Sequence, residues 1–190
     1  AFPDWRWEIH DVHDDLGGTW HTFRYPGIRS DSDMATFGFP FRPWPHDSTL
    51  GNGEDIKEYI RDTAREAGAL DRLHLGSWVA DADWRSDVQL YRVTCRNADG
   101  ERIVWARRVH FGSGYYSHSE GFRPEFPGEE DFRGQIIHPQ QWPEDLDYAG
   151  RRFVVIGSGA TAVTLVPALA ELGADVTMLQ RTPSSVSYTH

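Results

Sequence analysis

The sequence predicts an α/β fold, and three segments of the chain carry that prediction. An apolar run at 152–156, a glycine-rich turn, an apolar helix at 160–172 and a strand at 175–179 make one βαβ unit of about thirty residues. A helix at 54–67 and a β-hairpin within 88–106 precede this unit. Strands that alternate with helices are typical of sheets whose faces are covered by helices.

Composition limits the classes of function. The 190 residues include 19 basic and 29 acidic side chains, which leave a formal net charge of −10. A surface this acidic repels phosphate backbones and anionic membranes, so nucleic acid and membranes are not expected as partners. The single cysteine, Cys95, excludes an internal disulfide and dithiol redox chemistry. No apolar run approaches ~18 residues, and no signal-peptide pattern is present, so we expect a cytoplasmic protein.

The first third of the chain is expected to hold few regular elements. A short strand within 7–12 leads into a glycine pair, and residues 17–44 follow without a hydrophobic period. Because 17–44 is long and rich in aromatic residues, we expect an ordered, ligand-facing loop region. The helix at 54–67 has apolar residues at three- and four-residue spacing and acidic residues at its start, where the helix dipole favours them.

The middle of the chain is expected to be rich in β-structure. Strands at 88–95 and 102–106 flank Asn97-Ala98-Asp99-Gly100, whose residue types favour a hairpin turn. Residues 109–113 predict a short buried strand, and 117–128 predict a loop or linker because they are rich in glycine, proline and charge.

The βαβ unit has a distinctive internal pattern. Its first strand, 152–156, is continuously apolar, as expected of a parallel strand covered on both faces. Pro167 is expected to kink the following helix, and Gly173 is expected to end it.

A glycine motif lies between the first strand and the helix of this unit. Gly157-Ser158-Gly159-Ala160-Thr161-Ala162 is a GxGxxA pattern in the strand-turn-helix context of a dinucleotide-binding loop. Its glycines permit the tight turn and the close approach of a pyrophosphate to the backbone, and the helix N-terminus faces the anion. The alternative is a packing turn without a ligand.

The end of the second strand indicates which dinucleotide binds. An NAD site usually has an acidic residue there, but this chain reads Leu179-Gln180-Arg181-Thr182. Arg181 can pair with a 2′-phosphate and Thr182 can donate to it, so NADP is predicted over NAD. The alternative is that Arg181 is only a solvated surface charge.

Other acidic residues and histidines give no site on their own. Asp11 follows a strand, as a ribose-binding acid would, but the ten residues before it cannot supply a strand, a glycine turn and a helix. Asp11 taken alone is therefore a surface acid. The nine histidines show no metal-ligand spacing, and His10 and His13 are expected to be solvated, so no metal is predicted.

Three motifs in order resemble those of Baeyer–Villiger monooxygenases, from about Ile9 to Val186. They are Gly17-Gly18-x-Trp20 with Tyr25-Pro26-Gly27 and Asp31, then Phe132-x-Gly134-x-x-x-His138-x-x-x-Trp142-Pro143, and the GxGxxA loop. The runs Arg29-Ser30-Asp31-Ser32-Asp33-Met34 and His138-Pro139-Gln140 are similar to the bacterial ethionamide-activating branch. In the related flavin-containing monooxygenases the second motif usually ends differently from Trp142-Pro143.

The resemblance implies two nested Rossmann-like domains, for FAD and NADP, both incomplete in this chain. It implies a partial FAD domain over 1–125 that lacks its first βα unit, a linker over 126–150 and the start of an NADP domain over 151–190. It places Asp31 and His138 in catalytic roles, with Phe132 and Trp142 as buried anchors of the linker. The FAD residues it implies are Asp11, Gly17, Gly18, Thr19, Trp20, Arg29, Asp31, Val79 and Ser113. The NADPH residues it implies are Gly157, Ser158, Gly159, Thr161, Arg181 and Thr182.

The activity that the resemblance implies is oxygen transfer. FAD, NADPH and O2 would insert one oxygen atom into a ketone, or oxidise a sulfur or nitrogen group of a thioether or amine, through a flavin peroxide. Two alternatives stay open: a flavin-containing N- or S-oxygenase, and a catalytically silent fragment that is at most a partial NADP-binding module. Because the first FAD loop and the family's flavin-stabilising arginine are absent from these 190 residues, we expect the chain on its own to be inactive.

Overall fold

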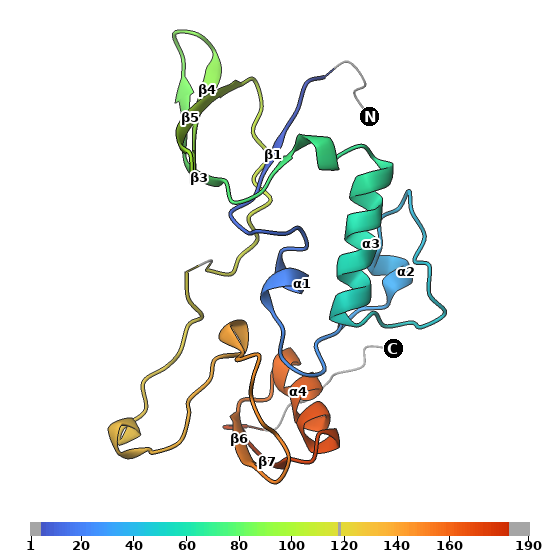
Figure 1. Cartoon of the computed structure of the whole chain (residues 1–190), viewed down its shortest axis with the longest axis vertical. Coiled ribbons are helices and arrows are strands. Elements are labelled where there is room, and N and C mark those ends of the chain that lie inside the picture. Colours follow the sequence, from blue (N-terminus) through green and yellow to red (C-terminus); the bar gives the residue numbers. More distant parts are fainter. Residues whose placement is uncertain (1–4, 118, 183–190) are drawn as a thin grey trace. The chain divides into compact units, whose positions relative to one another are not determined.

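The computed structural model describes residues 5–117 and 119–182, and the end of the family resemblance at Val186 lies outside them (Figure 1). The chain divides into two compact units. The first unit contains residues 1–21 and 57–116, and the second contains 22–56 and 117–190.

The first unit contains two small sheets and most of one long helix. Strands β1 (Ile9–His10) and β2 (Leu73–His74) pair in parallel, with His10 opposite His74. Strands β3 (Trp78–Arg85), β4 (Leu90–Asn97) and β5 (Gly100–Ala106) form an antiparallel sheet in that order. The long helix is α3 (Gly53–Glu66), and the short elements are α1 (Thr19–Thr22) and the 3-10 turn η1 (Leu70–Arg72).

The predicted helix and hairpin of this region are confirmed. Helix α3 differs from the predicted bounds by one residue at each end. In the hairpin Asn97 pairs with Gly100, and Gly100 has a φ of 128°, a backbone conformation that favours glycine. Strand β3 was not predicted: residues 80–84 alternate between apolar and polar, but the polar positions are aspartates, which are uncommon in strands.

The second unit is built around the predicted βαβ motif. Strands β6 (Arg152–Ile156) and β7 (Asp175–Leu179) pair in parallel, and helix α4 (Ala160–Glu171) connects them. Gly173 follows the helix with a φ of 85°, which confirms it as the stop. The remaining elements are α2 (Met34–Phe37) and the 3-10 turns η2 (Glu129–Asp131) and η3 (Pro139–Gln141).

The core of the second unit joins α4 to a segment more than a hundred residues away in sequence. Leu165 and Leu169 of α4 pack with Phe23 and Tyr25, and all four are buried. The partly buried residues against this cluster are Ile28, Trp142, Tyr148, Phe153, Val155, Ala174 and Val176. The Tyr25-Pro26-Gly27 motif therefore lies on the helix that follows the dinucleotide loop.

Three expectations about these elements are wrong. Residues 109–113 form no strand and Phe111 is exposed, because no strand among the described residues offers them a backbone ladder. Strand β6 is covered on one face only: Phe153 and Val155 pack on the core, whereas Val154 and Ile156 are more than half exposed. Residues 17–44 are also not wholly irregular, since they contain α1 and α2.

Candidate functional site: a dinucleotide loop, a glycine-pair loop and a histidine cluster

The dinucleotide loop leaves open space above its two glycines. Gly157 has a φ of 123°, which favours glycine, and its N–H donates to the Leu179 carbonyl at 2.8 Å. A Cβ on Gly157 or on Gly159 would meet nothing within 4 Å. A ligand can therefore approach the backbone of both residues, as a pyrophosphate requires.

Helix α4 begins at this loop without a capping side chain on its N-cap residue. Gly159 is that residue, and it supplies no side-chain hydrogen bond to the N–H groups of the first turn. Ala162, the last residue of the motif, is buried, as expected of a small residue at the helix–strand contact. The motif thus has the form of an anion-binding helix N-terminus.

A pocket of about 400 Å³ opens at the carboxyl ends of β6 and β7. It is lined by Ile156, Gly157, Ser158, Leu179, Gln180, Arg181 and Thr182. Ligands of open α/β sheets bind at this edge. Arg181 is exposed and forms no hydrogen bond or ion pair with any residue that the structure describes. The pocket therefore brings together the glycine loop and an unpaired guanidinium, and Gly159 and Thr161 continue the loop into α4.

The glycine-pair loop of the first unit is held by a network of charges. Gly17 and Gly18 both have positive φ, at 123° and 53°. A Cβ on Gly17 would lie 3.1 Å from Cγ of Lys57, whereas a Cβ on Gly18 would meet nothing within 4 Å. Thr19 and Trp20 follow in α1, whose first turn closes on the carbonyls of the two glycines. The open side of the loop is thus at Gly18.

Sequence reasoning missed the acidic residue that fixes this loop. The Asp15 carboxylate accepts from Lys57 Nζ at 3.0 Å, from Arg61 Nη2 at 2.5 Å and from the Leu16 N–H at 2.8 Å. Burial opposes ionisation of Asp15, but these donors outweigh it and lower the pKa of the carboxyl. The sequence feature that could have indicated this site is the four-residue spacing of Lys57 and Arg61, which places both cations on one face of α3.

Asp11 lies at the end of β1 and keeps one carboxylate oxygen available. Its Oδ1 accepts from both the backbone N–H and Nδ1 of His13, at 3.0 and 2.8 Å. No described residue donates to Oδ2.

Two further predicted FAD residues also lie in the first unit. Val79 is half-buried in β3, where its strand partner is Cys95, and Ser113 lies in the exposed irregular segment after β5.

Arg29 and Asp31 belong to the second unit and flank a buried serine. Ser30 is only 3% exposed, and its Oγ accepts from the Gly51 N–H at 3.0 Å. Arg29 forms an isolated bridge with Asn52, and both Arg29 and Asp31 are exposed. The predicted FAD residues are thus divided between the two units, whereas the predicted NADPH residues lie together in the second.

The linker motif is anchored by one of its two aromatic residues. Trp142 packs on the α4 core, and its Nε1 donates to the Tyr148 hydroxyl at 2.9 Å. Phe132 is 60% exposed, so its expected burial is wrong: its ring lies against Gly134 of the same loop and not in the core. His138 caps η3 by accepting from the Gln140 N–H at 3.2 Å, and its ring lies over Gly121.

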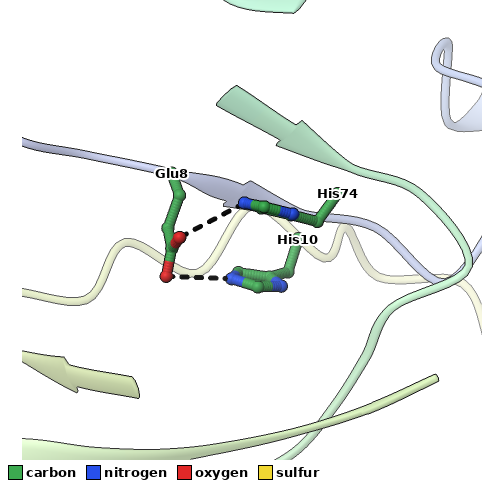
Figure 2. Close-up of side chains that lie close together, drawn as sticks. All are labelled: Glu8, His10 and His74. Carbon is green, nitrogen blue, oxygen red and sulfur yellow. Dashed lines mark ion pairs between the residues drawn. The ribbon is translucent and has the colours of Figure 1, made fainter. Parts of the chain in front are cut away.

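The structure also groups histidines that the sequence left apart. Glu8, His10 and His74 present three potential metal ligands whose atoms all lie within 4.8 Å of one another (Figure 2). The expectation of solvated histidines is wrong, because the side chains of His10 and His13 are only 11% and 19% exposed. Sequence spacing could not reveal the cluster, since the parallel pairing of β1 with β2 joins residues 64 positions apart.

Comparison with known proteins establishes the family. The sequence profile of flavin-binding monooxygenase-like proteins matches residues 25–188, so this chain belongs to that family. The FAD-containing monooxygenase EthA of Mycolicibacterium smegmatis is 51% identical over 173 residues, which cover 90% of this chain and 35% of that protein. The chain therefore spans about a third of the length of this relative.

Solved Baeyer–Villiger enzymes have the same fold. A closed structure of cyclohexanone monooxygenase is 31% identical with a TM-score of 0.75, over 92% of this chain and 33% of that one. Oxidised steroid monooxygenase bound to NADP is 26% identical with a TM-score of 0.77, over 92% and 34%. These matches confirm the predicted resemblance and the α/β fold of Rossmann type. Among the described residues, no helix is both long and apolar enough to cross a membrane.

Proposed function

We propose that this chain is part of an FAD- and NADPH-dependent monooxygenase that inserts one oxygen atom from O2 into a ketone. The observation that carries the proposal is the pocket at the ends of β6 and β7, where the glycine loop and the unpaired Arg181 face the same space. Family membership and the NADP bound to the related steroid monooxygenase support the proposal that this pocket receives NADPH.

NADPH fits the residues of the pocket. The open backbone of Gly157 and Gly159 and the N-terminus of α4 would receive the pyrophosphate. Arg181 would pair with the 2′-phosphate, with Thr182 as a second donor, because a guanidinium forms strong charge-assisted bonds with phosphate oxygens. NADH has no 2′-phosphate, so this pair would select NADPH.

The first unit supplies groups that fit FAD. Oδ2 of Asp11 can accept from a ribose hydroxyl, since His13 engages only Oδ1. The open side of Gly18, with Thr19 and Trp20 after it, can lie along the cofactor. We assign Val79 and Ser113 to the same cofactor, and Arg29 and Asp31 to its reactive end, on the family resemblance. FAD supplies the oxygen-activating chemistry when it is bound, and NADPH supplies the electrons.

His138 and Trp142 position the linker in this proposal. Trp142 holds the linker on the α4 core, and His138 orders its turn through the Gln140 N–H. Trp142-Pro143 matches the Baeyer–Villiger form of the motif, which supports a ketone substrate over an amine or thioether.

The test is a visible absorbance scan of the chain purified with excess FAD and then desalted. Retained flavin bands that bleach with NADPH under anaerobic conditions, and more slowly with NADH, would support the proposal for both cofactors. Flavin that is retained but not reduced by NADPH would contradict the pairing of the two cofactors. A colourless protein would support the alternative of a silent NADP-binding module, which NADPH titration followed by ligand fluorescence then identifies.

A further inference from the structure

The cluster of Glu8, His10 and His74 follows from strand geometry. Glu8 and His10 are two residues apart in an extended segment, so they point to the same side. The register of β1 with β2 places His74 beside His10, and the two imidazole rings stack with centroids 4.8 Å apart. Figure 2 shows both rings directing a nitrogen to the same carboxylate: His10 Nε2 is 3.4 Å from Glu8 Oε1, and His74 Nε2 is 3.2 Å from Oε2.

We propose that these three side chains form a binding site for a divalent transition-metal ion of the Zn²⁺ type. The ligands are Nε2 of His10, Nε2 of His74 and a carboxylate oxygen of Glu8. Two imidazoles and one carboxylate suit zinc and its first-row neighbours better than Mg²⁺ or Ca²⁺, which prefer oxygen ligands.

The ring of His10 is oriented for metal binding by a hydrogen bond on its second nitrogen. Its Nδ1 is hydrogen-bonded to Ser77 Oγ at 2.8 Å, and its Nε2 is buried without a hydrogen-bond partner. A metal-bound histidine is normally oriented by a hydrogen bond of this kind on the other ring nitrogen.

A cation would satisfy this buried nitrogen. When Nδ1–H donates to Ser77, the Nε2 lone pair faces the Glu8 carboxylate, and two acceptors confront each other. A metal ion between the nitrogen and the carboxylate would accept a lone pair from each, so two coordination bonds would replace the repulsion. The alternative is a proton on Nε2, but the 3.4 Å separation from Oε1 is long for a hydrogen bond to a carboxylate.

Arg102 limits how tightly the metal can bind. Its Nη2 donates to both Glu8 oxygens, at 2.6 and 2.7 Å. A carboxylate has lone pairs enough for a guanidinium and a metal together, so Arg102 can remain as an orienting partner. Its positive charge opposes a second cation, and we therefore expect weaker binding than at a cysteine-rich structural site.

The surrounding cavity leaves room for a further ligand. It measures about 100 Å³ and is lined by His10, His74, Leu75, Ser77, Cys95, Asn97 and Arg102. Three protein ligands and one open position are the arrangement of zinc sites that bind a water molecule. Burial raises the pKa of the Cys95 thiol, and its sulfur is not among the three clustered ligand atoms, so we expect it to stay protonated.

The test is titration of the tag-free, metal-stripped chain with Co²⁺, followed by visible absorbance, and then displacement by Zn²⁺. We expect saturation at one equivalent. Loss of a ligand in Glu8→Gln or His74→Ala should weaken binding more than about tenfold, the lower bound for losing even an outer-sphere partner. The exposed histidine variant His110→Ala is the matched control and should bind as the unmodified chain does.

A variant that gains an absorbance band distinguishes the loss of a metal ligand from the loss of folded structure. In a Cys95→Ser background, His74→Cys should add a sulfur-to-cobalt charge-transfer band that Cys95→Ser alone lacks. No saturable binding by the unmodified chain would overturn the proposal. Equal affinities in Glu8→Gln, His74→Ala and His110→Ala, or no new band with His74→Cys, would overturn it as well.

Discussion

Gly27 lies so close to the backbone of Thr164 that a Cβ on Gly27 would be 2.5 Å from the Thr164 carbonyl oxygen. The same Cβ would be 2.8 Å from Cβ of Ala168, and Gly27 has a φ of 79°. Glycine at position 27 therefore meets two requirements: a positive φ in its turn and a close contact with α4. This contact fixes the Tyr25-Pro26-Gly27 motif to the helix that carries the dinucleotide loop.

Gly27→Ala should destabilise the second unit by about 2–4 kcal/mol, because it adds overpacking against a backbone to positive-φ strain. Urea denaturation followed by tryptophan fluorescence measures this loss. Gly68→Ala is the control: Gly68 has a φ of 63° but open space beside it, so it should cost only about 1–2 kcal/mol. Equal losses in the two variants would contradict the close contact.

Asp15→Asn should loosen the glycine-pair loop. The substitution removes the charge that Lys57 and Arg61 share, in a carboxylate whose side chain is 30% exposed, so we expect a loss of about 1–2 kcal/mol. Asp87→Asn is the matched control, since Asp87 forms only an exposed ion pair at 3.7 Å, and it should change stability by less than about 0.5 kcal/mol. Similar losses of stability in Asp15→Asn and Asp87→Asn would contradict the role of Asp15 in holding the glycine-pair loop.

The contribution of Asp15 should also depend on pH. Its pKa in the folded chain is below the ordinary 3.8, so the folded state releases this proton more readily than the unfolded state. The resulting stability is complete above 3.8 and is lost as the pH falls through the lower, folded-state pKa. The difference in unfolding free energy between the unmodified chain and Asp15→Asn should therefore be flat from pH 7 to about pH 4 and shrink below it. A difference that grows on acidification would contradict the sign.

The sequence predicted local elements better than the contacts between them. Periodicity and turn residues sufficed for α3, for the hairpin at Asn97–Gly100 and for the βαβ unit, because these depend on neighbours in the chain. The strand-turn-helix pattern and the end of the second strand indicated the glycine loop and Arg181. The packing of Gly27 on α4 and the pairing of His10 with His74 join residues far apart in sequence, and no local pattern encodes them. The strand expected at 109–113 failed for the same reason, since apolar residues alone do not supply a pairing partner.

The hydrogen bond between Trp142 and Tyr148 should contribute measurably to the anchoring of the linker. A double-mutant cycle with Trp142→Phe and Tyr148→Phe isolates it, and we expect a coupling free energy of about 0.5–1.5 kcal/mol. Urea midpoints of the four proteins give this value. Strict additivity would show that Trp142 acts through its packing alone.

The most direct test of the proposed function compares the dissociation constants of NADPH and NADH for the unmodified chain and for Arg181→Ala. The charge-assisted pair with the 2′-phosphate should make NADPH bind more tightly by about 1.5–3 kcal/mol, roughly ten- to a hundredfold. Arg181→Ala should remove that preference and leave the affinity for NADH unchanged. Equal affinity of the unmodified chain for the two nucleotides would contradict the proposed pairing of Arg181 with the 2′-phosphate.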